Sequence, residues 1–253
     1  MQDKYAADIG DFGKFILLKQ LLVASPPQMR LGLNWYNVTT DEEPNNDGQH
    51  LKYLNHSYKK SILFKQCDPV LCEQLKSLVE YDRRSIAHLE DSAILPANTI
   101  YFSESIPLHP SDFKVRVSQR NSWFDRSAKV LSGVNAIFLD PDNGIQTPNV
   151  TKAQARMVKY AFLDEIKGLF DLCGFVVVYN HSNRSPQEVY RQKFIDAHEA
   201  VGSGSMMRVL RFKRFSVRDY VFLYRKEYVT TLDRLFDVLT NPPLDFLFSQ
   251  FVI

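Results

Sequence analysis

The stretch AIFLDPDNG, residues 136 to 144, decides the fold, because an apolar run stops at Asp140 and is followed by a proline, by Asp142 and by Asn143. Short apolar runs bounded by turn-forming residues are typical of buried strands. Ligands of open parallel sheets bind beyond the carboxyl ends of such strands. We therefore expect a strand at 135 to 140 with a functional edge after it, although these residue types are also ordinary turn formers.

The overall composition indicates a globular protein. The chain has 253 residues, of which 45% are hydrophobic, and a formal net charge of +2. This content suffices for a large core, and the near balance of charge means that any basic surface must be local. The start carries acids where a secretion signal has an apolar core, and no run approaches the roughly 18 apolar residues of a membrane span. We expect a cytoplasmic protein whose three cysteines are reduced thiols.

Short β-rich runs alternate with longer helical patterns, which is typical of an α/β protein with a largely parallel sheet. The most strand-like run, CGFVVVYNH at 173 to 181, is apolar as expected of a central strand covered on both faces. Two β-rich runs within 207 to 226 predict an antiparallel hairpin. The predicted fold is one three-layer, Rossmann-like α/β domain over 1 to 253, with a helical insertion at about 56 to 95. Helices are expected at 11 to 25, 68 to 90, 111 to 133, about 152 to 172, 186 to 200 and 230 to 239, further strands at 30 to 38 and 99 to 108, and a tail packed on the body or a partner at 245 to 253.

Polar side chains follow three of the predicted strands where those strands end. Because the carboxyl ends of parallel strands share one edge of a sheet, we expect these side chains to form one polar cleft. A histidine after a strand as apolar as FVVVY is not required by turn chemistry, although a structural role for it remains the alternative. The candidate site residues are Asp140, Asp142, Asn143, His181 and Arg184, joined by Asp41, Asp47 and Gly48 from the loop after the first strand.

The segment GDFGK at 10 to 14 begins the first predicted helix, with Asp11 as its expected cap. Free backbone amides at a helix start, together with Lys14, could hold an anionic group. The segment is neither a P-loop nor the GxGxxG fingerprint of a dinucleotide site. A plain helix start is the alternative.

Several segments together resemble a family of uncharacterised bacterial proteins. They are DIGDFGK at 8 to 14, NWY at 34 to 36, NNDG at 45 to 48, FLDPDNG at 138 to 144 and YNHSNR at 179 to 184. That family carries a D-x-G-K start, an NNDG loop, an LDPDNG segment and a Y-x-H-x-x-R segment in this order. The match spans about the first two-thirds of the chain and implies kinship without an activity.

The order of elements also resembles Rossmann-type S-adenosylmethionine methyltransferases, especially the bacterial ribosomal-RNA adenine-N6 class. In that class a D-P-P-Y segment after the fourth strand holds the target amino group through its acid and a neighbouring carbonyl, and its aromatic residue stacks on the base. Asp140 and Pro141 match the first two positions, whereas Asp142 and Asn143 replace the proline and the aromatic. The glycine-rich turn that should follow the first strand is also missing. The resemblance implies a methyltransferase-type fold and S-adenosylmethionine as cofactor, with Lys14, Asp41, Asp47 and Gly48 as cofactor-binding residues.

Three functions are compatible with these residues. A methyltransferase-like enzyme acting on nucleic acid would orient a substrate amine with Asp140 and rely on proximity and alignment. A metal-dependent phosphodiesterase or nuclease would bind Mg²⁺ or Mn²⁺ through Asp140 and Asp142, with Asp47 or His181, while Arg184 or Lys14 steadies the phosphate. A non-catalytic Rossmann-like binding module is the third.

Two further patterns bear on the choice between these functions. Pro141 and Asp142 followed by Glu165 and Lys167 imitate a PD...ExK nuclease. That pattern needs its ExK on a strand, whereas here we expect a solvated helix face. The hairpin at 208 to 220 interleaves basic and aromatic residues, which is typical of nucleic-acid surfaces, although a solvated edge hairpin reads the same way. Its residues are Arg208, Arg211, Lys213, Arg214 and Arg218, with Phe212, Phe215 and Tyr220.

Overall fold

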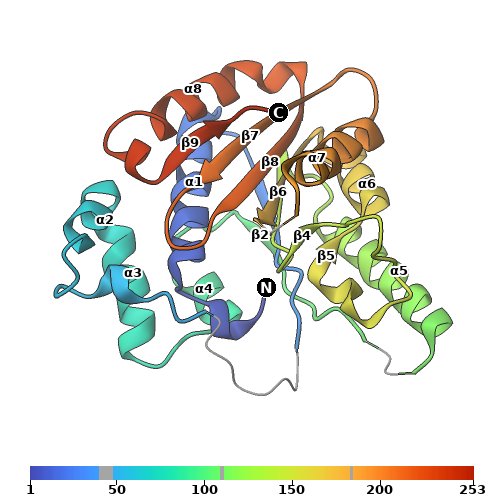
Figure 1. Cartoon of the computed structure of the whole chain (residues 1–253), viewed down its shortest axis with the longest axis horizontal. Coiled ribbons are helices and arrows are strands. Elements are labelled where there is room, and N and C mark those ends of the chain that lie inside the picture. The colour runs from blue at the N-terminus through green and yellow to red at the C-terminus, as the bar shows by residue number, and fades with distance from the viewer. Residues whose placement is uncertain (40–47, 109–110, 183–184) are drawn as a thin grey trace.

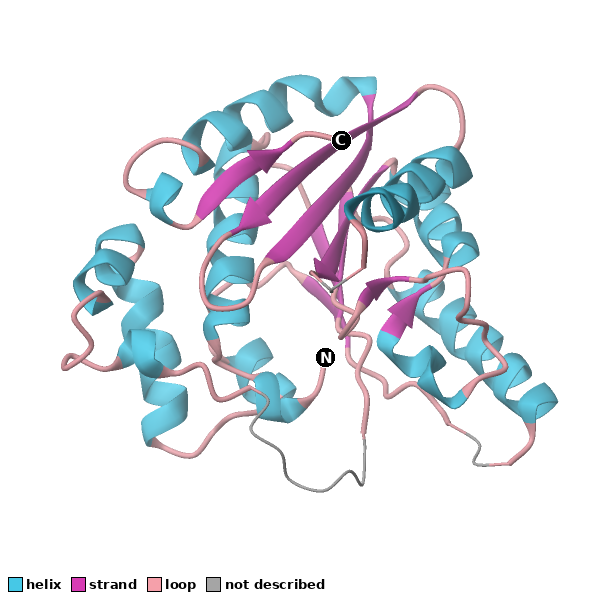
Figure 2. Ribbon diagram, in the orientation of Figure 1, coloured by secondary structure: helices cyan, strands magenta, loops and turns pink. Residues whose placement is uncertain are grey.

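The computed structural model describes residues 1–39, 48–108, 111–182 and 185–253. At its centre lies a seven-stranded sheet (Figures 1 and 2). Its strands, in order across the sheet, are β2 (Ile100–Phe102), β1 (Leu31–Asn34), β3 (Ala136–Leu139), β6 (Phe175–His181), β8 (Arg218–Arg225), β7 (Ser205–Phe212) and β9 (Phe248–Phe251).

The direction of the strands gives a mostly parallel sheet with an antiparallel edge. β2, β1, β3 and β6 are parallel, and β8 runs antiparallel between β6 and β7, so that β7 points the same way as β6. The predicted Rossmann-like α/β fold with a C-terminal hairpin is therefore confirmed. The tail also packs on the body as expected, because β9 pairs with β7.

Helices cover both faces of this sheet, which makes three layers (Figure 1). α1 (Ile9–Ala24) and α8 (Val229–Leu239) pack on one face, and α5 (Phe113–Val130), α6 (Leu163–Cys173) and α7 (Gln187–Val201) on the other. Because successive side chains of a strand point to opposite faces, Phe138 of β3 joins the α1 core and Ile137 joins the α5 to α7 core. In the described part of the chain, no helix is long and apolar enough to cross a membrane.

The two strands predicted at 30 to 38 and 99 to 108 are shorter than expected. β1 ends at Asn34, because the chain then turns through Tyr36, whose φ is 46°. The Asn34 side chain stabilises this turn by accepting a hydrogen bond from the Tyr36 N–H (3.0 Å). β2 ends at Phe102, whose carbonyl accepts from the Trp35 N–H (3.1 Å).

Three helices, α2 (Ser61–Cys67), α3 (Pro69–Glu80) and α4 (Ile86–Asp91), occupy the segment predicted as an insertion and lie beside α1 (Figure 1). The prediction of one continuous helix over 68 to 90 is wrong, because α3 and α4 are separate helices. The chain leaves the helix at Asp82, whose φ is 53°. Ser85 then starts α4 by accepting a hydrogen bond from the His88 N–H (3.2 Å).

The helix expected at about 152 to 172 begins only at Leu163. Tyr160–Ala161 (β5) instead pairs with Gly144–Ile145 (β4) in a small parallel sheet. The first turn of α6 is then fixed by Glu165, whose carboxylate accepts a hydrogen bond from the Phe162 N–H (3.2 Å). This small sheet anchors the loop that follows β3.

Gly144 in that loop approaches β6 closely. Its φ is 101°, and a Cβ atom would lie 2.2 Å from the Asn180 Oδ1. We expect Gly144→Ala to lower the free energy of unfolding by about 2 to 3 kcal/mol, because a left-handed conformation and an overlap with packed atoms each carry a cost. Urea denaturation measures this. Gly133→Ala is the matched control, since Gly133 has a φ of 83° but no atom within 4 Å; equal losses in both variants would contradict the prediction.

Candidate functional site

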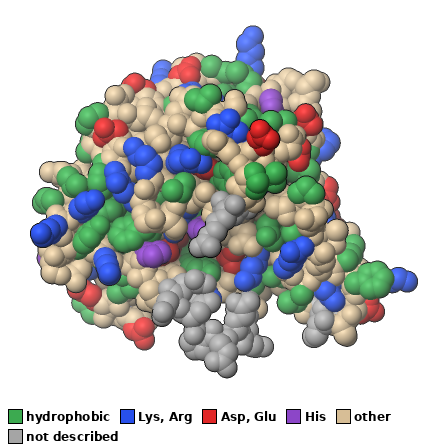
Figure 3. All heavy atoms as spheres, in the orientation of Figure 1, with side chains coloured by type: hydrophobic (Ala, Val, Ile, Leu, Met, Phe, Trp, Pro, Cys, Tyr) green, Lys and Arg blue, Asp and Glu red, His purple; other side chains and the backbone are tan. Residues whose placement is uncertain are grey.

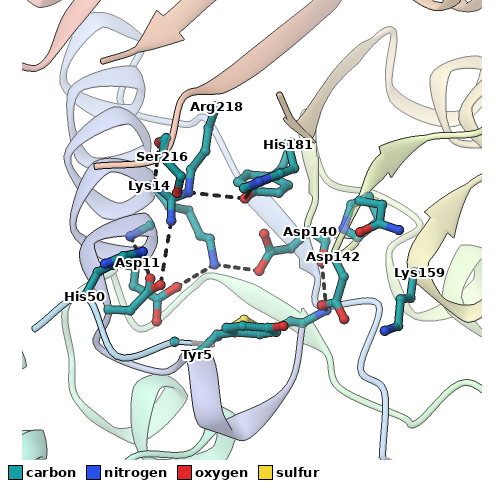
Figure 4. A pocket seen from close by; sticks show the side chains of 17 residues that line it. Tyr5, Asp11, Lys14, His50, Asp140, Asp142, Lys159, His181, Ser216 and Arg218 are labelled. Atoms are coloured by element: carbon teal, nitrogen blue, oxygen red, sulfur yellow. Dashed lines mark hydrogen bonds and ion pairs between the residues drawn. The ribbon is translucent and has the colours of Figure 1, made fainter. Parts of the chain in front are cut away.

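A cavity of about 370 Å³ lies at the carboxyl ends of β3 and β6 (Figure 4). Its walls are the N-terminal segment, the first turns of α1, the loop after β3, the end of β6 and the β7–β8 turn. Small-molecule sites have volumes of roughly 300 to 1,000 Å³. The cavity also adjoins the switch point of the sheet, where β2 lies on one side of β1 and β3 on the other. Both features are those of a ligand site.

The structure brings most of the predicted site residues to this cavity. Asp140, Asp142 and Asn143 after β3 meet His181 of β6 there, as the shared edge of the sheet required. Three others, Asp41, Asp47 and Arg184, lie outside the described residues. Lys14 and Gly48 also line the cavity.

Lys14 sits between two carboxylates at the base of the cavity (Figure 4). Its Nζ lies 2.6 Å from Asp11 Oδ1 and 2.5 Å from Asp140 Oδ2, and all three side chains are buried. Burial opposes the charge of Lys14, but the two carboxylates raise its pKa above the ordinary value. The ammonium is therefore paired inside the protein and is not presented to an anionic ligand, contrary to the expectation for GDFGK. We name Asp11, Lys14 and Asp140 the lysine triad.

The cap of α1 is Asp8 and not Asp11. The Asp8 Oδ1 accepts hydrogen bonds from the backbone N–H of Gly10 (2.6 Å) and of Asp11 (3.3 Å). The Asp11 carboxylate turns back to accept from the Ala7 N–H (2.9 Å). Because Asp11 and Lys14 are three residues apart on one helix face, this leaves Asp11 free to take part in the triad.

Acceptors that follow β3 converge on one amino nitrogen. The α-ammonium of Met1 donates to the Asp140 carbonyl oxygen (3.0 Å) and pairs with Asp142 Oδ1 (2.8 Å). The Gln2 amide also donates to Asp142 Oδ2 (2.6 Å). Burial favours the neutral acid, but the α-ammonium and the Gln2 amide hold the pKa of Asp142 below its ordinary value. Asp142 is therefore an ionised acceptor.

A hydrogen-bonded chain crosses the opposite wall of the cavity (Figure 4). Arg218 pairs with Asp8 (Nη2 to Oδ2, 3.6 Å) and its Nε donates to the Tyr179 hydroxyl (3.2 Å). That hydroxyl also lies 3.3 Å from His181 Nδ1. Burial raises the pKa of Tyr179 to about 12, so it remains a neutral hydroxyl that joins a base to a cation. Sequence reasoning missed Asp8 and Tyr179, although both lie in the DIGDFGK and YNHSNR segments.

Backbone strain lies beside the same cavity. Ala7 and Phe215 have φ values of 62° and 59°, and each adjoins a residue that lines the cavity. Positive φ is rare for residues other than glycine, and such strain concentrates at functional sites. The strain supports a ligand-binding role for the cavity.

The β7–β8 hairpin does not present the basic face that was predicted for 208 to 220. Its arginines are engaged within the protein: Arg208 pairs with Asp233, Arg211 pairs with Asp219, Arg214 donates to the Phe246 carbonyl oxygen (2.5 Å), and Arg218 is buried in the cavity wall. The predicted aromatic partners Phe212 and Tyr220 are buried as well. Exposed basic and aromatic groups remain only at the turn, around Lys213 and Phe215.

The imitation of a nuclease motif by Glu165 and Lys167 has a structural explanation. Both residues lie in α6, as predicted, and Lys167 pairs with Asp171 on an exposed face. Glu165 is not solvated, however. It is fully buried and forms two hydrogen bonds with Arg120 (Nε to Oε1, 2.7 Å; Nη2 to Oε2, 2.8 Å). Its role is to tie α6 to α5.

The arrangement of the acidic and histidine side chains bears on the metal-dependent alternative. Among residues 1–39, 48–108, 111–182 and 185–253, no three His, Cys, Asp or Glu side chains are placed to share a metal ion. The reason is visible at the two predicted ligands: the Lys14 ammonium pairs with Asp140 and the α-ammonium with Asp142. Cationic groups of the protein already neutralise the carboxylates that the metal-dependent alternative would use.

A second buried polar network lies on the other face of β6 and β8. Asp219 accepts hydrogen bonds from Arg211 and from the Tyr190 hydroxyl (2.6 Å), and Tyr190 in turn accepts from the Asn180 amide (2.8 Å). Lys193 is buried with its ammonium over the Tyr190 ring (4.4 Å). Burial lowers the pKa of Lys193 to about 8, because its effect is larger than the opposing effect of the Asp219 charge, which raises this pKa.

This lowered pKa predicts a pH dependence. Between about pH 8 and pH 10.5 the unfolded chain binds a proton at Lys193 that the folded chain does not, so stability from this group rises with pH. We expect the free energy of unfolding of the wild type, relative to Lys193→Met, to increase by roughly 1 to 2 kcal/mol over this range. Urea titrations of both proteins measure it, and the subtraction removes the tyrosines they share. Parallel pH profiles would contradict the prediction.

Together, these features define a Rossmann-like α/β protein with a polar cavity beside the switch point of its sheet. No family model matches the chain, and no curated protein matches it. Among solved structures, the chain is similar to protein LPL1258 from Legionella pneumophila str. Philadelphia 1, described under the family DUF519, with 11% identity over 97% of each chain and a TM-score of 0.48.

Proposed function

We propose that this protein is a methyltransferase-like enzyme that acts on nucleic acid, with the substrate amino group held at the end of β3. The observation that carries the proposal is the pair of acceptors formed by the Asp140 carbonyl and the Asp142 carboxylate. Both bind a single amino nitrogen, that of Met1, at 3.0 and 2.8 Å, and the Tyr36 carbonyl oxygen accepts from the same nitrogen (3.0 Å). A substrate amine would replace the α-amino group at these acceptors. The acid thus sits two residues after the position expected from the D-P-P-Y resemblance.

The role of Asp142 in this function follows from its charge. Because its pKa is held low, Asp142 accepts a hydrogen bond from the amine and is a poor base. Asp140 contributes its carbonyl, while its carboxylate stays in the lysine triad. Orientation of the amine nitrogen is the contribution we assign to these two residues, since alignment of reactants accounts for a large part of such barriers.

The charged groups of the cavity are compatible with S-adenosylmethionine. The glycine backbone that would let the cofactor come close to the chain is missing, however. The Asp8 carboxylate suits the positive groups of the cofactor and Arg218 suits its carboxylate; in this structure the two side chains pair with each other (3.6 Å). Gly48 does not open a path for the cofactor, because a Cβ there would meet the Lys4 carbonyl at 2.2 Å. When bound, the cofactor would supply an activated methyl group.

Ligand binding tests this proposal most directly. We expect S-adenosylmethionine to raise the melting temperature of the protein, because a ligand of the native state stabilises it, and we expect Mg²⁺ and Mn²⁺ not to. Isothermal titration calorimetry checks the same ligands. Binding of the metals alone would favour the phosphodiesterase alternative, and binding of none would favour a non-catalytic module.

Transfer of labelled methyl groups to ribosomal RNA or DNA tests catalysis. We expect Asp142→Asn to lower the rate roughly 100-fold, as loss of one preorganised hydrogen-bonding group does in other enzymes, while the cofactor still shifts the melting temperature. Asp171→Asn is the matched control, since Asp171 lies on the exposed face of α6. A fully active Asp142→Asn variant would refute the assignment.

A further inference from the structure

Phe215 is an exposed aromatic residue held in a strained conformation beside the cavity. It lies in the turn between β7 and β8, its side chain is 41% exposed, and its φ is 59°. A bulky residue at positive φ is a true outlier, and such residues persist where the surrounding structure enforces them. The turn therefore pays a conformational cost to present an aromatic ring at the surface.

Neighbouring rings fix the position of Phe215. Its ring centroid lies 5.4 Å from that of His50, 6.2 Å from Tyr58 and 6.3 Å from the buried Phe64. His50 lines the cavity, as does Ser216, the next residue along the turn. Figure 4 shows His50 and Ser216 at the wall of the pocket. The aromatic group thus adjoins the cavity through His50.

Exposed basic side chains lie next to members of this aromatic group in the sequence. Lys59 and Lys60 follow Tyr58, and Lys213 precedes Phe215 by two residues. The exposed Lys213 ammonium donates one hydrogen bond to the Asp245 carbonyl oxygen (2.7 Å). Figure 3 shows Lys and Arg side chains gathered on the side of the molecule formed by α2 and the hairpin turn. We name His50, Tyr58, Lys59, Lys60, Lys213 and Phe215 the turn surface. It is local, as a chain with a net charge of only +2 requires.

We infer that the turn surface binds single-stranded nucleic acid, with a base stacked on Phe215 and the phosphates held by Lys59, Lys60 and Lys213. Aromatic rings interleaved with cations suit this ligand, because every base has a face that stacks and every nucleotide carries a phosphate. Phe215 would supply the stacking ring that Asn143 cannot. The inference rests on the proposed function for its link to the cavity, since an enzyme that modifies a base must take it out of the duplex.

Tryptophan substitution tests the stacking. The two tryptophans of the chain, Trp35 and Trp123, are fully buried, so the added indole of Phe215→Trp reports on its own surroundings. We expect single-stranded RNA and DNA 12-mers to quench this added fluorescence. Tyr81→Trp is the matched control, since Tyr81 is 71% exposed at the end of α3, outside the turn surface. Quenching equal in the two variants would overturn the inference.

Affinity measured by fluorescence anisotropy provides the second test. We expect Phe215→Ala to weaken binding of the labelled 12-mers roughly 10-fold, because one base would no longer be stacked. We expect Lys59→Gln/Lys60→Gln to reduce the slope of log affinity against log salt by about 0.7 for each phosphate that the variant no longer neutralises. Lys226→Gln, at the far end of β8, should change neither. Unchanged affinity in Phe215→Ala would overturn the stacking.

The outcomes separate this inference from the proposed function. Binding that depends on Phe215, without any binding of S-adenosylmethionine, would leave the turn surface standing and remove the methyltransferase proposal. Binding of S-adenosylmethionine with nucleic-acid affinity independent of Phe215 would do the reverse. A preference for the RNA or the DNA 12-mer identifies the natural strand, and duplex binding tighter than either would overturn the inference.

Discussion

We expect Arg120→Met to lower the free energy of unfolding by about 3 kcal/mol, because the buried Glu165 carboxylate loses its two-bond cationic partner and keeps only Lys152, whose Nζ lies 3.7 Å from Glu165 Oε1. Arg120 and Glu165 are both fully buried and joined by two hydrogen bonds of 2.7 and 2.8 Å. The guanidinium also donates to the Tyr160 carbonyl (2.9 Å) and lies over the Trp123 ring. Urea denaturation followed by circular dichroism measures the loss.

The double variant Arg120→Met/Glu165→Gln separates loss of the pair from exposure of a single charge. In the wild type, the Phe162 N–H and the Tyr36 hydroxyl donate to the Glu165 carboxylate. The neutral amide of Gln at position 165 can still accept both hydrogen bonds. We therefore expect it to recover more than half of the lost stability. Lys167→Ala is the control on the same helix: its pair with Asp171 is about half exposed, so a change below about 0.5 kcal/mol is expected. A loss under about 1 kcal/mol in Arg120→Met would contradict this account.

The layers of the fold were predictable because local signals agree with the tertiary structure. The runs AIFL and FVVVY are apolar throughout, and both lie between two layers of helices, where each face of a strand needs apolar residues. The hairpin was predictable from two close β-rich runs. The start of the helix expected at 152 to 172 was not predictable. Val158 and Phe162 continue a helical spacing, whereas Tyr160 between them pairs with Gly144 in a small sheet.

The candidate site could be located from the sequence, but its charges could not be assigned. Strand ends predicted that Asp140 and His181 would reach one cavity. The pairing of charges depends on distances between elements that no local pattern contains: Lys14 and Asp140 are 126 residues apart in the chain. The same limit applies to the hairpin, whose arginines alternate like a solvated face yet find acidic partners in other elements.

The lysine triad should also be essential for folding. We expect Lys14→Met to lower the free energy of unfolding by about 3 to 5 kcal/mol at neutral pH, because Asp11 and Asp140 would then be buried without their shared cation. Lys19→Met is the control on the same helix, since Lys19 pairs with Asp68 at a partly exposed position and should cost at most about 1 kcal/mol.

The loss in Lys14→Met should depend on pH in a direction set by the carboxyl groups. Burial already raises the pKa of Asp11 and of Asp140, and Lys14 opposes that rise. Without Lys14, both groups would bind protons in the folded protein at pH values where the unfolded chain has released them. The free energy of unfolding of the variant should therefore fall as pH rises from about 4 towards neutrality. Over the same range the free energy of unfolding of the wild type should fall less. Adding Asp11→Asn to Lys14→Met should flatten this profile, because it removes one buried acid. A loss in Lys14→Met that is constant across this range would show that the triad acts through packing alone and that its charges are not what Lys14 stabilises.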